Sequence, residues 1–255
     1  MQRYFISKEQ VEDQTIKIIG EDVHHITRVM RGKPGDQIIC NTDEGKSALC
    51  KIEEVYETEV QASIEAWLDE SAELPVEVTI AQGIPKSDKF EWILQKGTEL
   101  GAAKFIPFAA ERSVAKWDDQ KFHKKAKRFE KIIKEASEQS HRNRIPELSS
   151  VMKLKALLEE SESCTVKLFA YEEEAKGAAN KISSFSSALD KLSEKDRVLL
   201  VIGPEGGISL EEADILKESG FQAIRLGKRI LRTETAALYA LAGISYHMEE
   251  LNYKN

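Results

Sequence analysis

From about residue 76 onward, short apolar runs alternate with longer stretches in which apolar residues recur at helical spacing. The clearest run, RVLLVIG at 197–203, reads as a strand that opens into a glycine-rich turn. Strands that alternate with helices in this way indicate a parallel sheet covered by helices on both faces. The expected strands span 76–82, 103–109, 164–170, 197–203 and 221–227.

The expected helices of this region have recognisable starts and stops. Ser209 and Glu212 form the sequence pattern of a capping box, and Gly220 is placed to end the helix that follows. A Ser-rich link with a short helix is expected after the strand at 164–170. The other expected helices begin at Ser87, at about Asp118 and at Thr233, which we expect to cap its helix.

The first seventy residues have a different pattern, typical of an all-β fold. Runs rich in β-branched and aromatic residues recur at a spacing of roughly ten residues, with turn signals at 33–36 and 43–45, and this spacing indicates a small barrel. The composition becomes acidic and loop-like at 69–75. The sequence therefore predicts a β-barrel domain over 1–72 and an α/β domain over 73–255.

Other features limit the class of protein. The three cysteines, Cys40, Cys50 and Cys164, are widely spaced and include no C-x-x-C pair, which argues against a disulfide framework and against a zinc site. No apolar run approaches the roughly 20 residues that span a bilayer, and the N-terminus lacks a signal-peptide pattern. We expect a cytoplasmic protein with no metal and no membrane contact.

The charge is unevenly distributed. The formal net charge is −7, yet residues 112–144 contain eleven Lys or Arg against five Asp or Glu, a local charge of +6. A basic stretch of this kind is typical of a nucleic-acid-binding surface. The alternative is a solvated helix face with pairs such as Lys131 with Glu135 and Lys134 with Glu138.

A second basic segment, EDVHHITRVMRG at 21–32, interrupts the β pattern. Val23, Ile26, Val29 and Met30 have helical spacing, which predicts a short helix against the barrel. The polar members of the segment fit either a solvated helix end or a surface that contacts phosphates, and both interpretations stay open. These members, with the lysine that follows, are His24, His25, Arg28, Arg31 and Lys33.

The glycine-rich turn GPEGG at 203–207 fits none of the common nucleotide or hydrolase motifs. The spacing excludes G-x-x-x-x-G-K-[ST] and G-x-G-x-x-G, and G-x-S-x-G and H-E-x-x-H do not occur. Gly206 and Gly207 permit positive φ and a close approach of the backbone to a ligand. Because the Glu205 carboxylate would repel a phosphate at a helix N-terminus, a neutral or cationic nucleoside fits better.

The segment LGKRILR at 226–232 supplies a complementary pattern. Ile230 and Leu231 lie between cations in an expected loop, so we expect both to fold inward over an apolar ligand such as an adenine ring. Arg232 stands at a helix N-terminus, where a cation gains nothing from the helix dipole. A substrate anion or a polarised base oxygen would explain its position.

Together, IGPEGG and LGKRILRTETA resemble the cofactor-binding region of the SPOUT, or α/β-knot, RNA methyltransferases. The resemblance extends over nearly the whole chain, and specifically to the members that methylate N3 of uridine 1498 in 16S ribosomal RNA. The other segments that carry it are RYF, HHITRVMRGKPGD, DKFEWILQKGTELGAAKFIPFAAERSV and EASEQSHRNRIPEL.

The resemblance implies a fold, a cofactor and partners. The C-terminal domain would be a trefoil-knotted parallel sheet flanked by helices, which binds S-adenosyl-L-methionine, and the N-terminal domain a PUA-like barrel that grips RNA. The partners would be a second copy of the chain, in a homodimer, and 16S rRNA in the assembled small ribosomal subunit. Two rivals stay open: an assembly factor without catalysis, and a knotted methyltransferase of another base or of tRNA.

The resemblance also implies functional residues. For catalysis we favour Arg232, with Arg142 as second choice, to stabilise charge on the uridine; Glu205 and Glu234 are candidate bases. The expected cofactor contacts are Ile202, Gly203, Glu205, Gly206, Gly207, Leu226, Gly227, Ile230, Leu231, Thr233 and Ala236. The expected RNA contacts are Arg3, Arg28, Arg31, Lys33, Arg112, Lys124, Lys127, Lys131 and Arg144.

Overall fold

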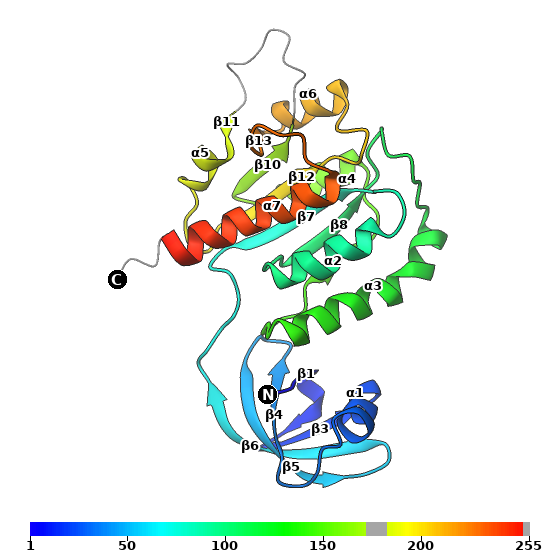
Figure 1. Ribbon diagram of the computed structural model, residues 1–255, viewed down its shortest axis with the longest axis vertical. Coiled ribbons are helices and arrows are strands. Elements are labelled where there is room, and N and C mark those ends of the chain that lie inside the picture. Colours follow the sequence, from blue (N-terminus) through cyan, green and yellow to red (C-terminus); the bar gives the residue numbers. More distant parts are fainter. Residues whose placement is uncertain (172–182, 252–255) are drawn as a thin grey trace. The chain divides into compact units, whose positions relative to one another are not determined.

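The computed structural model describes residues 1–171 and 183–251. The chain forms two compact units (Figure 1), which we call the N-terminal and the C-terminal unit. The N-terminal unit contains Met1–Glu73 and also Ser137–Ile145, and the C-terminal unit contains Leu74–Ala136 and Pro146–Asn255. The two units are therefore not consecutive stretches of the sequence.

The N-terminal unit is a curled, mostly antiparallel sheet with the strand order β1-β4-β5-β6-β3-β2. Among the strands that the structure describes in this sheet, only β1 and β4 pair in parallel. Alternate residues such as Ile16, Ile18, Cys50 and Ile52 fill its core, as the period of a strand requires. The strands are β1 (Arg3–Ile6), β2 (Val11–Glu12), β3 (Thr15–Ile19), β4 (Gln37–Thr42), β5 (Ser47–Val55) and β6 (Glu59–Leu68).

The segment expected as one short helix between β3 and β4 is an α-helical turn, α1 (Glu21–His24), followed by a π-helical turn, η2 (His25–Val29). Another turn, the 3₁₀ helix η1 (Lys8–Gln10), precedes β2. Val23 and Ile26 are buried as expected, but Val29 and Met30 are exposed. The wider π turn, in which the Met30 amide donates to the His25 carbonyl, rotates these two residues off the buried face.

The C-terminal unit is built on a sheet whose described strands all pair in parallel, in the order β11-β13-β10-β12-β7-β8-β9. This confirms the predicted parallel sheet, and each of the five expected strands is present. The short strands β9 and β11 were not expected. The strands are β7 (Glu77–Gly83), β8 (Lys104–Phe108), β9 (Glu147–Leu148), β10 (Val166–Ala170), β11 (Ser183–Ser184), β12 (Arg197–Ile202) and β13 (Gln222–Arg225).

Helices cover both faces of this sheet, as predicted. Residues of α2, α3, α5 and α7 share one core with Leu200 and Ile202 of β12, whereas residues of α4 and α6 share the other core with Leu199 and Val201. The helices are α2 (Lys89–Glu99), α3 (Asp119–Gln139), α4 (Leu154–Ser161), α5 (Phe185–Leu189), α6 (Leu210–Glu218) and α7 (Thr233–Ser245), which continues into the π turn η3 (Tyr246–Leu251).

Several boundaries follow from local chemistry. The capping box at α6 is present: the Ser209 hydroxyl accepts from the Glu212 amide, and the Glu212 carboxylate accepts from the Ser209 amide. Gly220 takes a φ of +86° directly after α6. Helix α4 was not expected, and the Ser-rich link expected before α5 begins within 172–182, outside the described residues.

Candidate active site

The GPEGG turn at 203–207 packs directly against the end of strand β7. A Cβ atom added to Gly83 would lie 2.4 Å from the backbone nitrogen of Pro204 and 2.8 Å from the carbonyl carbon of Gly203. No side chain fits at this contact. Because β7 and β12 are parallel neighbours, the turn and the segment after β7 emerge at the same edge of the sheet.

A buried hydrogen-bond chain joins this turn to the start of helix α7. The hydroxyl of Thr233 donates to the carbonyl oxygen of Gly203 at 2.6 Å and accepts from Nε2 of Gln82 at 2.7 Å. Gln82 is fully buried, and its Nε2 also donates to the Gly83 carbonyl at 3.0 Å. The prediction that Thr233 caps α7 is therefore wrong: Arg232 is the N-cap residue, and the Thr233 hydroxyl is engaged with the turn.

A charged contact joins the same segments nearer the surface. Lys89 Nζ, in the first turn of α2, lies 3.0 Å from Oε1 of Glu205 and 3.2 Å from Oε2 of Glu234. The Glu205 carboxylate also accepts from the Lys86 amide. Burial opposes ionisation of Glu205, but the contacts with Lys89 and the Lys86 amide outweigh it and lower its pKa. Glu205 is therefore a poor proton acceptor.

The two adjacent glycines of the turn serve different purposes. Gly207 has a φ of +71°, as expected, whereas Gly206 is not among the residues with positive φ. Gly206 instead lies against the backbone of Arg112, where an added Cβ would approach the Arg112 carbonyl oxygen to 2.9 Å. The Arg112 guanidinium also approaches the Gly206 carbonyl, at 3.4 Å. Arg112 thus forms part of the wall behind the turn.

The loop between β13 and α7 was expected to fold two apolar residues, Ile230 and Leu231, inward, and only one of them does so. Leu226 is buried, and Leu231 packs against the core beneath α7. The prediction that Ile230 folds inward is wrong, because its side chain is 88% exposed. Leu231 occupies the inward position of this irregular loop, and its neighbour is left outside. Of the other expected cofactor contacts, Ile202 and Ala236 belong to the same core as Leu231.

Arg232 is exposed, with an extended backbone (φ −65°, ψ 154°). Its guanidinium makes no hydrogen bond or ion pair with any residue in the part of the chain that the structure describes. The side chain is therefore available to a ligand beside the turn and the start of α7.

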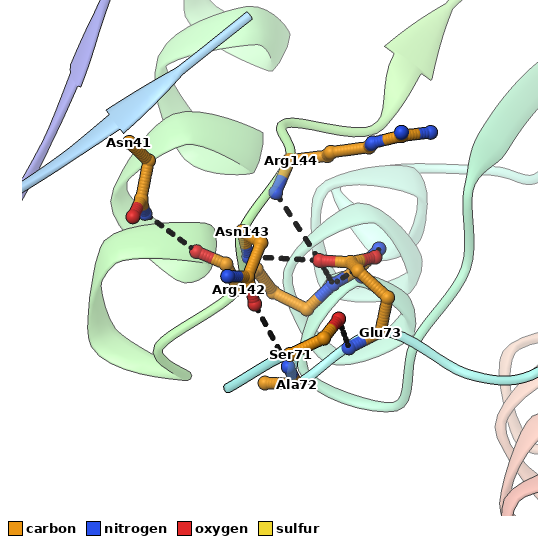
Figure 2. A network of polar contacts seen from close by, with 7 residues as sticks. All are labelled: Asn41, Ser71, Ala72, Glu73, Arg142, Asn143 and Arg144. Carbon is orange, nitrogen blue, oxygen red and sulfur yellow. Dashed lines mark hydrogen bonds and ion pairs between the residues drawn. The ribbon is translucent and has the colours of Figure 1, made fainter. Parts of the chain in front are cut away.

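Arg142, the second choice for catalysis, lies in the N-terminal unit and is only 2% exposed. Its Nε donates to both oxygens of Glu73, at 2.9 and 3.0 Å, and Nη2 donates to Oε2 as well (Figure 2). The same carboxylate accepts from the backbone amides of Asn143 and Arg144. This geometry indicates a structural role for Arg142, and we do not carry it into the proposed mechanism.

Further contacts fasten the segment 137–145 to the N-terminal sheet. Asn41 donates from Nδ2 to the Arg142 carbonyl at 2.8 Å, and Asn143 donates to the Ser47 hydroxyl, also at 2.8 Å (Figure 2 shows the first contact). Asn143 Oδ1 accepts from the Ala72 amide. Every contact of this group joins residues distant in the sequence, so the pattern of the sequence alone did not reveal it.

The residues expected to bind RNA are mostly exposed. In the C-terminal unit, Lys124, Lys127 and Lys131 lie on the exposed side of α3, and Lys131 lies 3.9 Å from Glu135, as the alternative interpretation expects. Arg144 donates to the Glu44 carbonyl in the N-terminal unit. In that unit Arg3 is half-buried, whereas the remaining three, Arg28, Arg31 and Lys33, are exposed.

His24 is exposed, and Nδ1 of His25 lies 3.1 Å from the Tyr4 hydroxyl, which leaves both interpretations of that segment open. Within residues 1–171 and 183–251, no three His, Cys, Asp or Glu side chains are grouped to hold a metal ion. No helix in the same ranges is long and apolar enough to cross a membrane.

Two protein-family models match this chain. "RNA methyltransferase domain" matches residues 72–245, and "RNA methyltransferase PUA domain" matches residues 18–65. A relative from Bacillus subtilis (strain 168), Ribosomal RNA small subunit methyltransferase E, is 48% identical over 254 residues, 98% of each chain. The chain belongs to the ribosomal RNA small subunit methyltransferase E family. The predicted class of enzyme and the predicted PUA-like domain are thereby confirmed.

Solved structures agree with membership of the methyltransferase E family. The putative methyltransferase Lpg2936 from Legionella pneumophila, solved with bound SAM, is 32% identical, covers 95% of this chain and 96% of its own, and has a TM-score of 0.80. The methyltransferase E from Neisseria gonorrhoeae, bound to S-adenosyl methionine, is 29% identical with the same TM-score, and the match covers 96% of this chain and 97% of that one.

Proposed function

We propose that this chain transfers the methyl group of S-adenosyl-L-methionine to N3 of uridine 1498 in 16S ribosomal RNA. One observation carries the proposal: the two segments expected to hold the cofactor, 203–207 and 226–236, are joined by the Thr233–Gly203 hydrogen bond. Relatives of 32% and 29% identity were solved with this cofactor bound, and the Bacillus relative is named for the small-subunit rRNA.

In the proposal, the adenosine part of the cofactor lies against the backbone of the GPEGG turn and the apolar side chains of the second segment. The chemistry of the site fits such a ligand, because Glu205 and Glu234 repel phosphate yet attract a cationic sulfonium. Bound S-adenosylmethionine supplies an electrophilic methyl group. The proposed contacts remain those expected from the sequence, except that Ile230, being exposed, would have to move to reach the ligand.

The chain's own residues must position the uridine and stabilise the charge that forms on it. N3 carries a proton at neutral pH, and once that proton leaves, negative charge develops on O2 and O4. The guanidinium of Arg232, which has no partner among the described residues, is the group we assign to that charge. Glu205 and Glu234 both pair with Lys89, so we assign neither as the base, and the proton passes to water.

Deletion of the gene tests the proposed function. The 16S rRNA of the deletion strain should lack N3-methyluridine at position 1498 by mass-spectrometric mapping, and the wild-type gene should restore it. Loss of a different modified nucleoside would assign the chain to another base or to tRNA. If no nucleoside is lost and the purified protein binds no S-adenosylmethionine by calorimetry, the chain is an assembly factor.

The trefoil knot, the homodimer, the assembled small subunit as substrate and the cytoplasmic location stay predictions. The homodimer is supported by large apolar side chains that are exposed in the C-terminal unit on α2, on α7 and after it. These side chains are Trp92, Tyr239 and Tyr246. A second copy of the chain is the partner that we propose for them.

For helix α3 we predict a role in RNA binding. Replacing Lys124, Lys127 and Lys131 together with glutamine should weaken RNA binding. The negative slope of log K against log salt should become shallower by about 2, because each phosphate contact contributes roughly 0.7 to 0.9 to its magnitude. Lys131 contributes less because Glu135 is close. Filter binding at several salt concentrations measures the slope. Cofactor affinity should be unchanged, and glutamine at Lys153, the N-cap residue of α4, and at Lys155 within α4 is the control.

A further inference from the structure

Lys89 holds together two carboxylates that the sequence treats as separate candidates. Its Nζ lies 3.0 Å from Glu205 in the turn after β12 and 3.2 Å from Glu234 in the first turn of α7. These two glutamates lie in different segments of the chain, and Lys89 is the first residue of a third element, helix α2. One ammonium group thus joins three segments at the edge of the sheet.

The burial of this cluster distinguishes it from ordinary surface pairs. The exposed fractions of the side chains are 28% for Lys89, 27% for Glu205 and 16% for Glu234. Salt screens such partly buried charges less than fully exposed ones. Two carboxylates share one ammonium, so the cluster keeps one negative charge in excess, which is the charge that a sulfonium cation would meet.

We propose that Lys89 is a positioning residue for the cofactor: its ammonium group fastens the GPEGG turn to the start of α7. The inference rests on the proposed use of S-adenosylmethionine. The inference adds the start of α2 to the two segments, 203–207 and 226–236, that the sequence indicates for cofactor binding. The partly buried Thr233–Gly203 hydrogen bond joins the same two segments at a second point, so loss of Lys89 should loosen the site without unfolding it.

The charged groups around Glu205 come from three elements. Lys89 comes from α2, Glu234 from α7 beyond Lys89, and Arg112 from the loop after β8, where its guanidinium approaches the carbonyl of Gly206. Burial favours the protonated form of Glu205, and Lys89 is the main group that opposes it. Without Lys89 the pKa of Glu205 should rise, so that a larger fraction of the carboxylate is protonated in acid than in the wild type.

Calorimetric titration with S-adenosylmethionine at pH 7.5 and pH 5.5 tests the inference. The wild type should bind equally at both, within about twofold, because a lowered pKa keeps Glu205 ionised. Lys89→Met should bind about tenfold more weakly at pH 7.5, and at least about threefold more weakly again at pH 5.5. Lys89→Arg should restore most of the affinity and the flat pH profile.

Two further variants distinguish the effect of losing the Lys89–Glu205 ion pair from the effect of a general loss of structure. Lys89→Met combined with Glu205→Gln should show a smaller pH dependence than Lys89→Met, because one of the two carboxyls that lose the ammonium partner is gone. Lys96→Met is the matched control: Lys96 lies on the same helix and pairs with Glu99 at 2.7 Å, and its loss should change neither affinity nor profile. Melting temperatures of all variants show whether each is folded.

Each result has a defined meaning. If folded Lys89→Met binds the cofactor like Lys96→Met, with a flat pH profile, the inference is wrong while the proposed function stands. The inference is also wrong if Lys89→Met loses affinity and Lys89→Arg does not restore it. A wild type that binds no S-adenosylmethionine overturns the proposed function itself.

Discussion

Replacing Arg232 with alanine is expected to slow methyl transfer in a single turnover by about 100- to 1,000-fold, the usual effect of removing one donor from a developing oxyanion. The guanidinium stands at the start of α7 without a partner in the described residues. Its charge would stabilise the deprotonated uridine ring more than the neutral one, so the loss should appear in the rate rather than in cofactor binding.

The measurement is a single-turnover assay with saturating S-adenosylmethionine and 16S rRNA, paired with a cofactor titration. Arg229→Ala supplies the control, because Arg229 is an exposed arginine of the same loop. That variant should retain the wild-type rate within a few-fold. An Arg232→Ala enzyme that methylates at an undiminished rate would show that another group stabilises the charge.

Replacing Glu73 with glutamine is expected to destabilise the N-terminal unit by about 3 kcal/mol, because it leaves the buried Arg142 guanidinium without its counter-charge. Glutamine has almost the same shape, so the effect isolates the charge. Amide hydrogen exchange of β4 and β5 reports on this unit separately from the rest of the chain. Glu70→Gln, an exposed change three residues away, should leave exchange unaltered.

The Glu73–Arg142 ion pair also leads to a prediction about how stability depends on pH. Burial opposes ionisation of Glu73, but Arg142 and the amides of Asn143 and Arg144 outweigh it and lower its pKa. A carboxyl with a lowered pKa in the folded state stabilises the protein above its ordinary pKa of about 4.3, and that stability is lost as the pH falls through the folded value. After correction for the intrinsic pH dependence of amide exchange, the protection of β4 and β5 should therefore decrease at pH values below about 4 in the wild type. If Glu73→Gln shows the same acid dependence, another group is responsible.

Local patterns in the sequence predicted most elements of the C-terminal unit, because their signals lie within a few residues. The capping box of Ser209 and Glu212 is one example, and the apolar run at 197–203 is another. The parallel sheet followed from the alternation of such signals. Strands β9 and β11, each of two residues, carry too little pattern to be recognised.

The geometry of the candidate site was predicted only in part. The sequence singled out the segments around Gly203 and Thr233, because it concentrates unusual residues there. The partners of individual side chains were not: Thr233 bonds to Gly203 rather than to its own helix, and Lys89 reaches residues more than a hundred positions away. Ile230 and Leu231 show the same limit, because the type of residue does not fix which of two neighbours faces inward.

The polar contacts of Asn41, Ser47, Glu73 and Asn143 have a consequence for how this chain can be divided or recombined. A fragment that ends near residue 73 would lack Arg142 and Asn143, and its remaining partners would be left with unmet hydrogen-bonding groups. The first seventy residues therefore cannot be moved into another protein as a self-contained domain. A chimaera between two relatives should take both pieces from the same parent.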